Sequence, residues 1–457
     1  MAMSLPLTPQ DLQQLLQPYQ MQWQDSSSWP QFPVICQLFS DDQGLIMVLC
    51  RDDSLVDLHR LRKLTGRFLA AASPEQRQSF CAKLAMETLP AFPEIHSLPT
   101  LVDRRLLEWS NWTFCVARHQ WVTARQPNQL LQQPAVNVLP FTDLLPEVTH
   151  DWDLQLQQDV PLINQAVSRF TAKRIQQRLD ETLELPPLSQ TARAILDLRN
   201  DPDADAVKLA AIIEADASLA AQVVGWAANA YFSAPGKVRS VQDAVVRVLG
   251  YELVMNLALG LSLGACVRPG LLHQRSMLQY WQQSMLMAAA MNGLNRLIPE
   301  SYRPSYGLVY LTGLLHNFGH LILAEIFPPQ FAALVPSIEA NIHLEPNAIE
   351  QQMLGISREQ IASALLANWH LPSEVITGIR FIRHPEYMGV HADYAQLAAV
   401  ALKLLRFYGL VSGPVTAVEP SLFESLQIDP HRAEAFMQQF CAQAPEIEEA
   451  ARLLVSK

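Results

Sequence analysis

The feature that most constrains this fold is the succession of apolar segments with helical spacing that begins after about residue 150. In the stretch 206–232 apolar residues recur every three or four positions, with a break near Asp216. Ser240 at a capping position and Gly250 at the end delimit the next segment. Pro and Gly separate the later segments, and no repeat of fixed period occurs. The second part of the chain is therefore predicted to be an all-α domain of roughly 200 residues with a helical tail.

The first part of the chain alternates short β-rich runs with helix starts. The runs 33–39 and 44–50 flank a turn-forming group, which predicts a hairpin. Ser54 and Asp57 predict the start of a helix by the spacing of a capping box. Three further runs are typical of strands, namely 99–103, 112–117 and 120–124. Together these patterns predict an α+β domain.

A stretch rich in Pro, Gln and Asn, 126–150, separates the two parts and lacks a clear period. We interpret it as a linker that leads into a connecting helix. The predicted organisation is an α+β domain at 1–125, a linker and connecting helix at 126–174, a helical domain at 175–390 and a helical extension at 391–457.

The charge of the chain argues against binding of nucleic acid through phosphate neutralisation. The net charge is -11, and residues 1–150 carry 14 acidic against 11 basic side chains, while the remainder carries 30 against 22. A protein that holds nucleic acid mainly through its phosphates needs a basic excess. We therefore do not expect nucleic acid as the main partner.

Neither disulfides nor membrane insertion is expected. The six cysteines are scattered, without a CxxC pair and without zinc-finger spacing to histidine. The N-terminus lacks a charged leader followed by an apolar run, and the longest apolar runs are too short to span a bilayer. These features predict a cytoplasmic protein that does not bind a membrane.

A series of short motifs runs through the second part of the chain. They are Leu185 to Leu188, Leu209 to Leu219, Ala228 to Tyr231, Val241 to Gly250, Tyr280 and Trp281, Gly313 to Gly319, Glu350, and Trp369 to Pro372 followed by Ile379 and His384. In their order and spacing these motifs resemble the HDOD family, helical relatives of the HD-type phosphohydrolases. The resemblance covers about residues 175–390.

The resemblance implies a metal site whose ligands this chain has lost. An HD hydrolase gathers His and Asp side chains around divalent ions that activate water. Asn is a weaker ligand than a carboxylate, and a fixed arginine repels a metal ion. The last acid of the set is absent from the helix predicted at 395–405. The corresponding residues are Gln283, His316, Asn317, Glu350, Arg358, Arg383 and His384.

Two interpretations of this remnant stay open, beside a third that restores a metal. The favoured one is a polar cluster that fixes helix geometry. The second is an anion pocket in which Arg358 and Arg383 act as bidentate donors. The third is a metal held by His316 and His320, four residues apart on one helix, although no third ligand is apparent. We expect no catalytic residue, no metal and no cofactor.

In the first part, the stretches 50–66 and 92–108 resemble the YbaK/ProX-type domains that deacylate mischarged tRNA. The lysine and the Gly-rich loop of that family are absent from the matching regions. The resemblance therefore implies the fold, whereas the editing chemistry lacks its residues. A cluster of basic residues could face tRNA or phosphate, but we favour a solvated face paired with Asp53 and Asp57. The cluster comprises Arg60, Arg62, Lys63 and Arg67.

The sequence thus favours a non-catalytic signalling or regulatory protein of bacterial type that acts through an unidentified protein partner. A second hypothesis is an HD-type metal-dependent phosphohydrolase acting on nucleotides or cyclic dinucleotides. A third is tRNA binding or aminoacyl-tRNA editing by the first domain.

Overall fold

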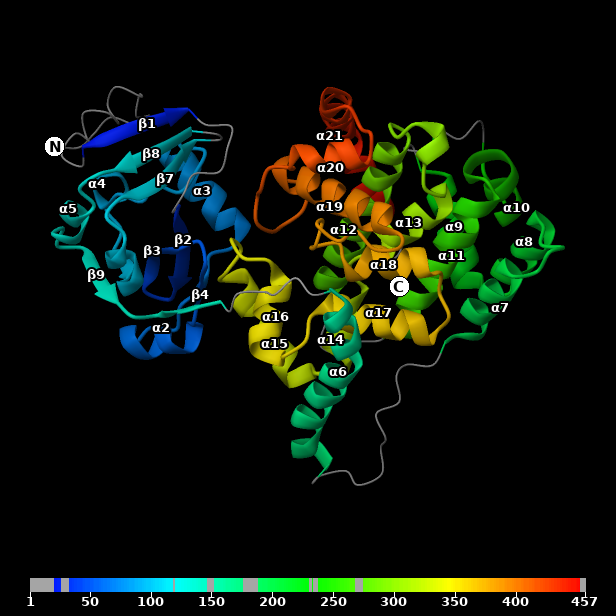
Figure 1. Ribbon diagram of the computed structural model, residues 1–457, viewed down its shortest axis with the longest axis horizontal. Coiled ribbons are helices and arrows are strands. Elements are labelled where there is room, and N and C mark those ends of the chain that lie inside the picture. Colours follow the sequence, from blue (N-terminus) through cyan, green and yellow to red (C-terminus); the bar gives the residue numbers. More distant parts are fainter. Residues whose placement is uncertain are drawn as a thin grey trace. The chain divides into compact units, whose positions relative to one another are not determined.

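The chain folds into two units, and each unit combines two separate stretches of sequence. In the computed structural model the first unit comprises Met1–Thr149 and Ala333–Ile349, and the second comprises His150–Ala332 and Glu350–Lys457 (Figure 1). The structure describes residues 20–25, 33–117, 120–145, 152–175, 188–229, 232, 237–267 and 274–452. Residues 185–187 and 230–231, which belong to the motifs that resemble the HDOD family, lie outside the described residues.

The first unit is built on a five-stranded sheet with the strand order β5-β2-β3-β6-β9. The predicted hairpin is confirmed, because β2 and β3 pair antiparallel from Val34 opposite Arg51 to Asp41 opposite Gly44. Strands β3, β6 and β9 run parallel. The strands are β2 (Val34–Asp41), β3 (Gly44–Arg51), β5 (Ala70–Ala71), β6 (Thr100–Asp103) and β9 (Val136–Leu139).

Two smaller sheets and several short helices also belong to the described part of this unit. Strands β1 (Met21–Asp25), β8 (Gln120–Ala124) and β7 (Trp112–Ala117) form an antiparallel sheet, and β10 (Thr142–Leu144) pairs with β4 (Ser54–Val56). The strands predicted at 99–103, 112–117 and 120–124 are therefore confirmed. The helices are α2 (Leu58–Thr65), α3 (Pro74–Leu84), α4 (Pro93–His96), the 3-10 helix η2 (Arg104–Glu108) and α5 (Asn128–Leu131).

Strand β3 divides the core of the first unit between its two faces. Ile46, Val48 and Cys50 belong to one buried cluster, and Met47 and Leu49 belong to another. Alternation places successive side chains of a strand on opposite faces, so this strand is apolar throughout because both of its faces are covered.

Two local predictions for this unit differ from the structure. The helix expected from Ser54 begins at Leu58, because Ser54–Val56 is strand β4 and the carboxylate of Asp57 accepts the backbone N–H of Arg60 as the N-cap. The stretch interpreted as the start of a linker contains α5, β9 and β10. The many Pro and Gln residues around 136–139 hide the sequence pattern of a strand there. This segment forms strand β9 by pairing with β6, which is distant in sequence.

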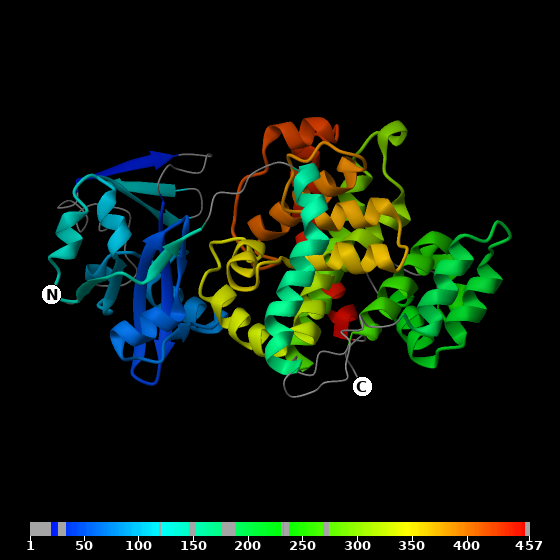
Figure 2. The ribbon, with the colours of Figure 1, turned by 60° about the horizontal axis from the view of Figure 1, so that its bottom comes forward.

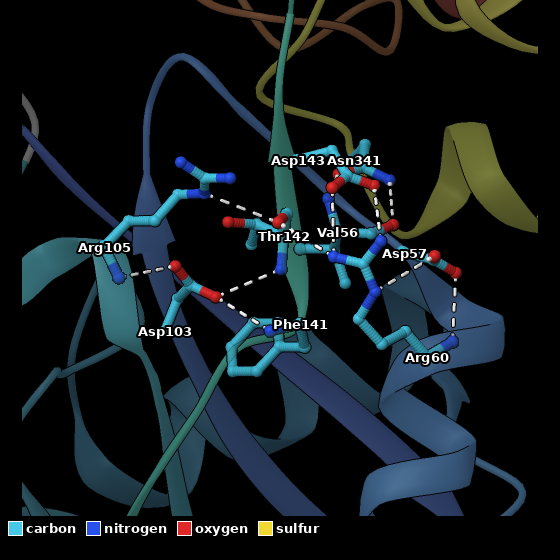
Figure 3. Close-up of polar contacts among 9 residues, drawn as sticks. All are labelled: Val56, Asp57, Arg60, Asp103, Arg105, Phe141, Thr142, Asp143 and Asn341. Carbon is cyan, nitrogen blue, oxygen red and sulfur yellow. Dashed lines mark hydrogen bonds and ion pairs between the residues drawn. The ribbon is translucent and has the colours of Figure 1, made fainter.

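The stretch Ala333–Ile349 completes the edge of β4. The side-chain amide of Asn341 accepts the backbone N–H of Val56 at 2.7 Å and donates to its carbonyl at 3.1 Å, as a neighbouring strand would (Figure 3). The Nε2 atom of His343 lies 3.0 Å from the carbonyl of Ser54, and Ala340 joins the core cluster around Val56.

The second unit is helical, as predicted. Asp216 caps a helix by accepting the N–H groups of Ser218 and Leu219, which confirms the break expected there. Its elements are α6 (Trp152–Ile175), α7 (Gln190–Arg199), α8 (Ala206–Glu214), α9 (Ala217–Ala227), α10 (Val241–Asp243), the π-helix η4 (Ala244–Leu249), α11 (Tyr251–Cys266), α12 (Gln274–Asn295), η5 (Glu300–Tyr302), α13 (Tyr306–Leu315), α14 (Phe318–Ile326), α17 (Arg358–Asn368), α18 (Ser373–Arg380), α19 (Ala392–Phe407), α20 (Pro420–Ser425) and α21 (Pro430–Arg452), with α15 (Pro328–Glu339) and α16 (Pro346–Leu354) shared between the units.

The centre of this unit is formed by α12 and α13. Helix α12 packs against α13, α19 and α21, and α13 packs against α11 and α18. Figure 2 shows α6 as a long blue-green helix, and α17 contacts it. Among the described residues, Tyr306–Ile326 is apolar and long enough to cross a membrane, but 94% of its most apolar window is buried, a pattern that core helices share.

Candidate functional site

The residues that resemble the HD pair, His316 and Asn317, lie at the junction of α13 and α14. Glycines on either side of the pair let this junction approach its neighbours. A Cβ atom on Gly313 would lie 2.5 Å from the Cα of Ala288, and one on Gly319 would lie 1.9 Å from the carbonyl oxygen of Arg358. The second contact shows that α14 touches the backbone at the start of α17.

The two histidines of this junction are held in their neutral form. The Nδ1 atom of His316 lies 2.8 Å from the carbonyl of Gly313, and burial lowers the pKa of His316 to about 4. Burial lowers the pKa of His320 to about 3, and its ring packs against Phe331 at 4.8 Å between centroids. Within the described part of the chain, the buried Nδ1 of His320 has no hydrogen-bond partner.

Arg358, the first residue of α17, forms the centre of the site. Its Nε donates to Glu350 at 2.5 Å, and its backbone N–H donates to the other oxygen of the same carboxylate at 2.8 Å. Its Nη1 donates to the side-chain oxygen of Asn317 at 2.6 Å. Arg358 is 6% exposed and Glu350 is fully buried, so the charge of the guanidinium is matched inside the protein.

Arg383 and His384 lie next to this cluster. The Nε of Arg383 donates to the buried Glu359 at 2.6 Å. Burial alone would raise the pKa of Glu359, but the guanidinium groups of Arg383 and Arg358 outweigh it and hold that pKa below its usual value. His384 packs against Trp152 at 4.8 Å between ring centroids, and burial lowers its pKa.

A third buried ion pair was not foreseen from the sequence. Asp159 of α6 accepts from Arg380 at 2.5 and 2.9 Å and from Gln360 at 2.6 Å. All three side chains are buried. The Ser357–Gln360 spacing is a capping-box signal that can be found in the sequence, and both of its hydrogen bonds are present. Asp159 offers no such signal, because its partner Arg380 lies 221 residues away.

Gln283, like His316 and His384, is not joined to the other predicted site residues by these contacts. It lies on α12 and is half-buried, and its side chain forms no hydrogen bond with a described residue. The contacts therefore bring together Asn317, Glu350 and Arg358, and they join Arg383 to Glu359.

The side chains present here do not fit a divalent metal ion. A metal at the HD position needs carboxylates and imidazoles that face a common point. Instead Arg358 occupies the acceptor atoms of Glu350 and Asn317. Within the described residues, no group of three or more His, Cys, Asp or Glu side chains is arranged to hold a metal.

The basic cluster of the first unit is largely neutralised within that unit. Arg60 pairs with Asp143 through two hydrogen bonds of 3.0 Å and lies 3.6 Å from Asp57 (Figure 3). Arg67 donates to Asp41 at 2.8 and 2.5 Å. Arg62 donates to the carbonyl of Leu69, and Lys63 is exposed. The expected partner Asp57 is present, whereas Asp53 pairs with Arg51 instead.

Comparison with known proteins identifies the helical part of the chain. A model of the HDOD domain matches residues 185–385. The crystal structure of a protein from Marinobacter aquaeolei VT8, whose proposed role is signal transduction, matches 98% of this chain and 100% of that chain, with 35% sequence identity and a TM-score of 0.86.

Two further matches are more distant. An HDOD domain protein of unknown function from Geobacter sulfurreducens matches 66% of this chain and 99% of that chain at 21% identity and a TM-score of 0.52, which supports the fold alone. An uncharacterized protein of Treponema pallidum (strain Nichols) is 27% identical over 217 residues, which are 46% of this chain and 39% of that protein. The match thus spans less than half of that relative.

Proposed function

Because the chain belongs to the family of HDOD-domain proteins, we propose that it is a non-catalytic regulatory protein whose helical unit acts by binding a protein partner. The HDOD match and the Marinobacter relative support a regulatory role. We infer the loss of hydrolase chemistry from the site, and we infer a cytoplasmic location from the sequence alone.

The observation that carries the proposal is the position of Arg358. Its guanidinium binds both Glu350 and Asn317, the side chains that a metal at the HD position would require. A divalent ion about 4 Å from this charge would be repelled by roughly 8 kcal/mol at an effective dielectric constant of about 20. Binding of a metal would therefore require Arg358 to leave a buried and fully paired position.

The same contacts favour the structural interpretation over an anion pocket. Arg358 is bound by Glu350, and Arg383 is bound by Glu359. An incoming anion would have to displace a buried carboxylate, which would then lose the arginine that it is paired with. We infer that the remnant of the HD site is a polar cluster that fixes the packing of α14, α16 and α17.

Metal analysis and a hydrolysis assay test this proposal against the phosphohydrolase alternative. Purified protein should contain no stoichiometric divalent metal, and it should not hydrolyse bis(p-nitrophenyl) phosphate when Mn²⁺ or Mg²⁺ is added. A turnover that disappears in a folded His316→Ala variant would establish the enzyme instead. Affinity isolation of the full chain from its native host should yield a stoichiometric protein partner.

The resemblance of the first unit to YbaK/ProX-type domains stays a proposal. Its support is the order of elements, in which β3 and β4 are followed by α2, and β6 ends in Val102 and Asp103. The pairing of Arg60 and Arg67 with carboxylates argues against tRNA contact through the basic cluster. A tRNA gel shift that depends on salt and is lost after Arg60→Glu and Arg62→Glu would support the tRNA hypothesis, and we expect no shift.

A further inference from the structure

The first unit contains an open pocket of about 410 Å³ where β6, η2 and β10 meet. This volume lies within the range of about 300–1,000 Å³ that is typical of sites for small molecules. Three arginines line the pocket, together with two acids and one threonine: Arg60, Arg104, Arg105, Asp103, Glu108 and Thr142. The proposed function does not use this pocket.

Asp103 builds the floor of the pocket. Its carboxylate accepts the backbone N–H of Arg105 at 2.9 Å and the backbone N–H groups of Phe141 and Thr142 at 3.0 Å each (Figure 3). Asp103 is fully buried, so these three donors tie the start of η2 to the strand β10. These hydrogen bonds connect the backbone of η2 to that of β10, and they hold Arg104 and Arg105 near Thr142.

Two of the three arginines keep donors for a ligand. Arg60 is occupied by Asp143. Arg105 uses its Nε for a long contact of 3.5 Å to the carbonyl of Thr142, and its terminal nitrogens have no partner among the described residues. The exposed side chain of Arg104 likewise contacts no described hydrogen-bond acceptor. The pocket therefore presents unused guanidinium donors from two adjacent residues.

The acids of the pocket are already bound to other groups. Both oxygens of Asp103 are engaged by backbone N–H groups. Glu108 pairs with Arg51 at 3.1 Å. Neither Arg104 nor Arg105 forms an ion pair with a described residue, and their charge favours an anionic ligand.

An unpaired hydroxyl group supplies an independent observation. Thr142 is 2% exposed, and its Oγ1 atom has no hydrogen-bond partner among the described residues. In Figure 3 this hydroxyl points to the side on which Arg105 lies, away from Arg60. A buried hydroxyl without a partner destabilises a fold, so such a group inside a pocket indicates a missing partner.

We propose that this pocket binds a small molecule that carries a phosphate monoester. Arg104 and Arg105 donate to the phosphate oxygens, and the hydroxyl of Thr142 donates to a third oxygen. Guanidinium groups match the geometry of phosphate, and a phosphate monoester offers three terminal oxygens to several donors at once. The side chains of Leu107 and Pro140, which also line the pocket, contact the organic part of the ligand.

Isothermal titration calorimetry tests the proposal. The full chain is titrated with inorganic phosphate at constant ionic strength. We expect saturable binding at concentrations up to about 10 mM. Arg104→Gln should weaken it about tenfold or more, because a charge-assisted hydrogen bond is lost. Lys63→Gln is the matched control, since it removes one exposed positive charge from the same unit and should leave the affinity unchanged.

Thr142→Val separates a role in binding from a role in folding. The substitution removes an unpaired hydroxyl, so the unliganded protein should be at least as stable as the wild type, while its affinity for phosphate should fall. Circular dichroism confirms that each variant is folded. The proposal is overturned if phosphate does not bind, if Arg104→Gln and Lys63→Gln weaken binding equally, or if only tRNA binds and Arg104→Gln abolishes that binding.

Discussion

Arg358 joins a buried carboxylate and a buried amide, since its guanidinium donates to both Glu350 and Asn317. In our proposal this ion pair stands where an HD hydrolase would place a metal. A buried ion pair contributes little net stability, because desolvation offsets the attraction, but the loss of one partner leaves an unpaired buried charge. Replacing one residue of the ion pair should therefore lower the stability of the fold, whereas replacing both residues together should change it little.

Arg358→Ala should lower the free energy of unfolding by about 3–5 kcal/mol, since it leaves Glu350 buried without its partner. Urea denaturation measures this loss. The double variant Glu350→Gln with Arg358→Met should recover much of it, because both charges are removed. A single variant as stable as the wild type would show that water reaches Glu350 and that the pair is not structural.

The neutral state of His316 predicts a dependence of stability on pH. Its folded pKa is about 4, below the value of about 6.5 expected in the unfolded chain. The unfolded state therefore binds more protons between these values, and stability falls as the pH drops from about 6.5 to about 4. The full effect of one such histidine is on the order of 3 kcal/mol.

His316→Gln should flatten this dependence. The free energy of unfolding, measured by urea denaturation at pH 7 and pH 5, should differ less in the variant than in the wild type. His431→Gln, which changes an exposed histidine, should leave the difference unchanged. An unchanged difference in His316→Gln would mean that His316 is already solvated in the folded state.

Among the elements, α14 and α17 are placed by a glycine rather than by a polar contact. A Cβ on Gly319 would lie 1.9 Å from the carbonyl oxygen of Arg358, a backbone atom that no rotamer change can move. This close approach brings Asn317 within reach of Arg358. The glycine in the HD-like stretch thus serves packing, and the geometry of the polar cluster follows from it.

Gly319→Ala should destabilise the fold by about 1–3 kcal/mol or more, because α14 must move away from α17. Gly293→Ala is the matched control: its Cβ would meet the ring of Phe436, a side chain that can rotate. Thermal unfolding should show a clearly larger loss for Gly319→Ala. Equal losses would indicate that helix α14 shifts without cost.

On the scale of the whole molecule, the boundary between units does not follow the order of the sequence. The HDOD match covers 185–385, yet Ala333–Ile349 within it belongs to the first unit. Asn341 supplies the partners that the backbone of Val56 would otherwise lack. The first unit is consequently incomplete without a segment from inside the helical domain.

Asn341→Ala should cost about 1–3 kcal/mol of local stability, since it leaves the N–H and carbonyl groups of Val56 unpaired. Hydrogen exchange should become faster at the amide of Val56 and at its neighbours in β4. Ile342→Ala, at an adjacent and partly exposed position, serves as the control and should leave exchange there unchanged. Slow exchange at Val56 in both variants would contradict the role given to Asn341.

The sequence by itself determined the features that depend on neighbours within a few residues. The β2–β3 hairpin and the helix starts at Asp216 and Ser240 follow from turn and capping groups whose hydrogen bonds span three residues or fewer. The HDOD resemblance also came from the order of local motifs. Its match at 185–385 accords with this order.

Only the tertiary structure decided which charged groups pair and which side chains satisfy the backbone groups at a strand edge. Arg358 meets Asn317 across 41 residues, Arg380 meets Asp159 across 221, and Val56 meets Asn341 across 285. No local pattern identifies such partners, because the choice depends on how distant elements pack. A buried charge or an open strand edge is stable only beside a matching group, and packing selects that group.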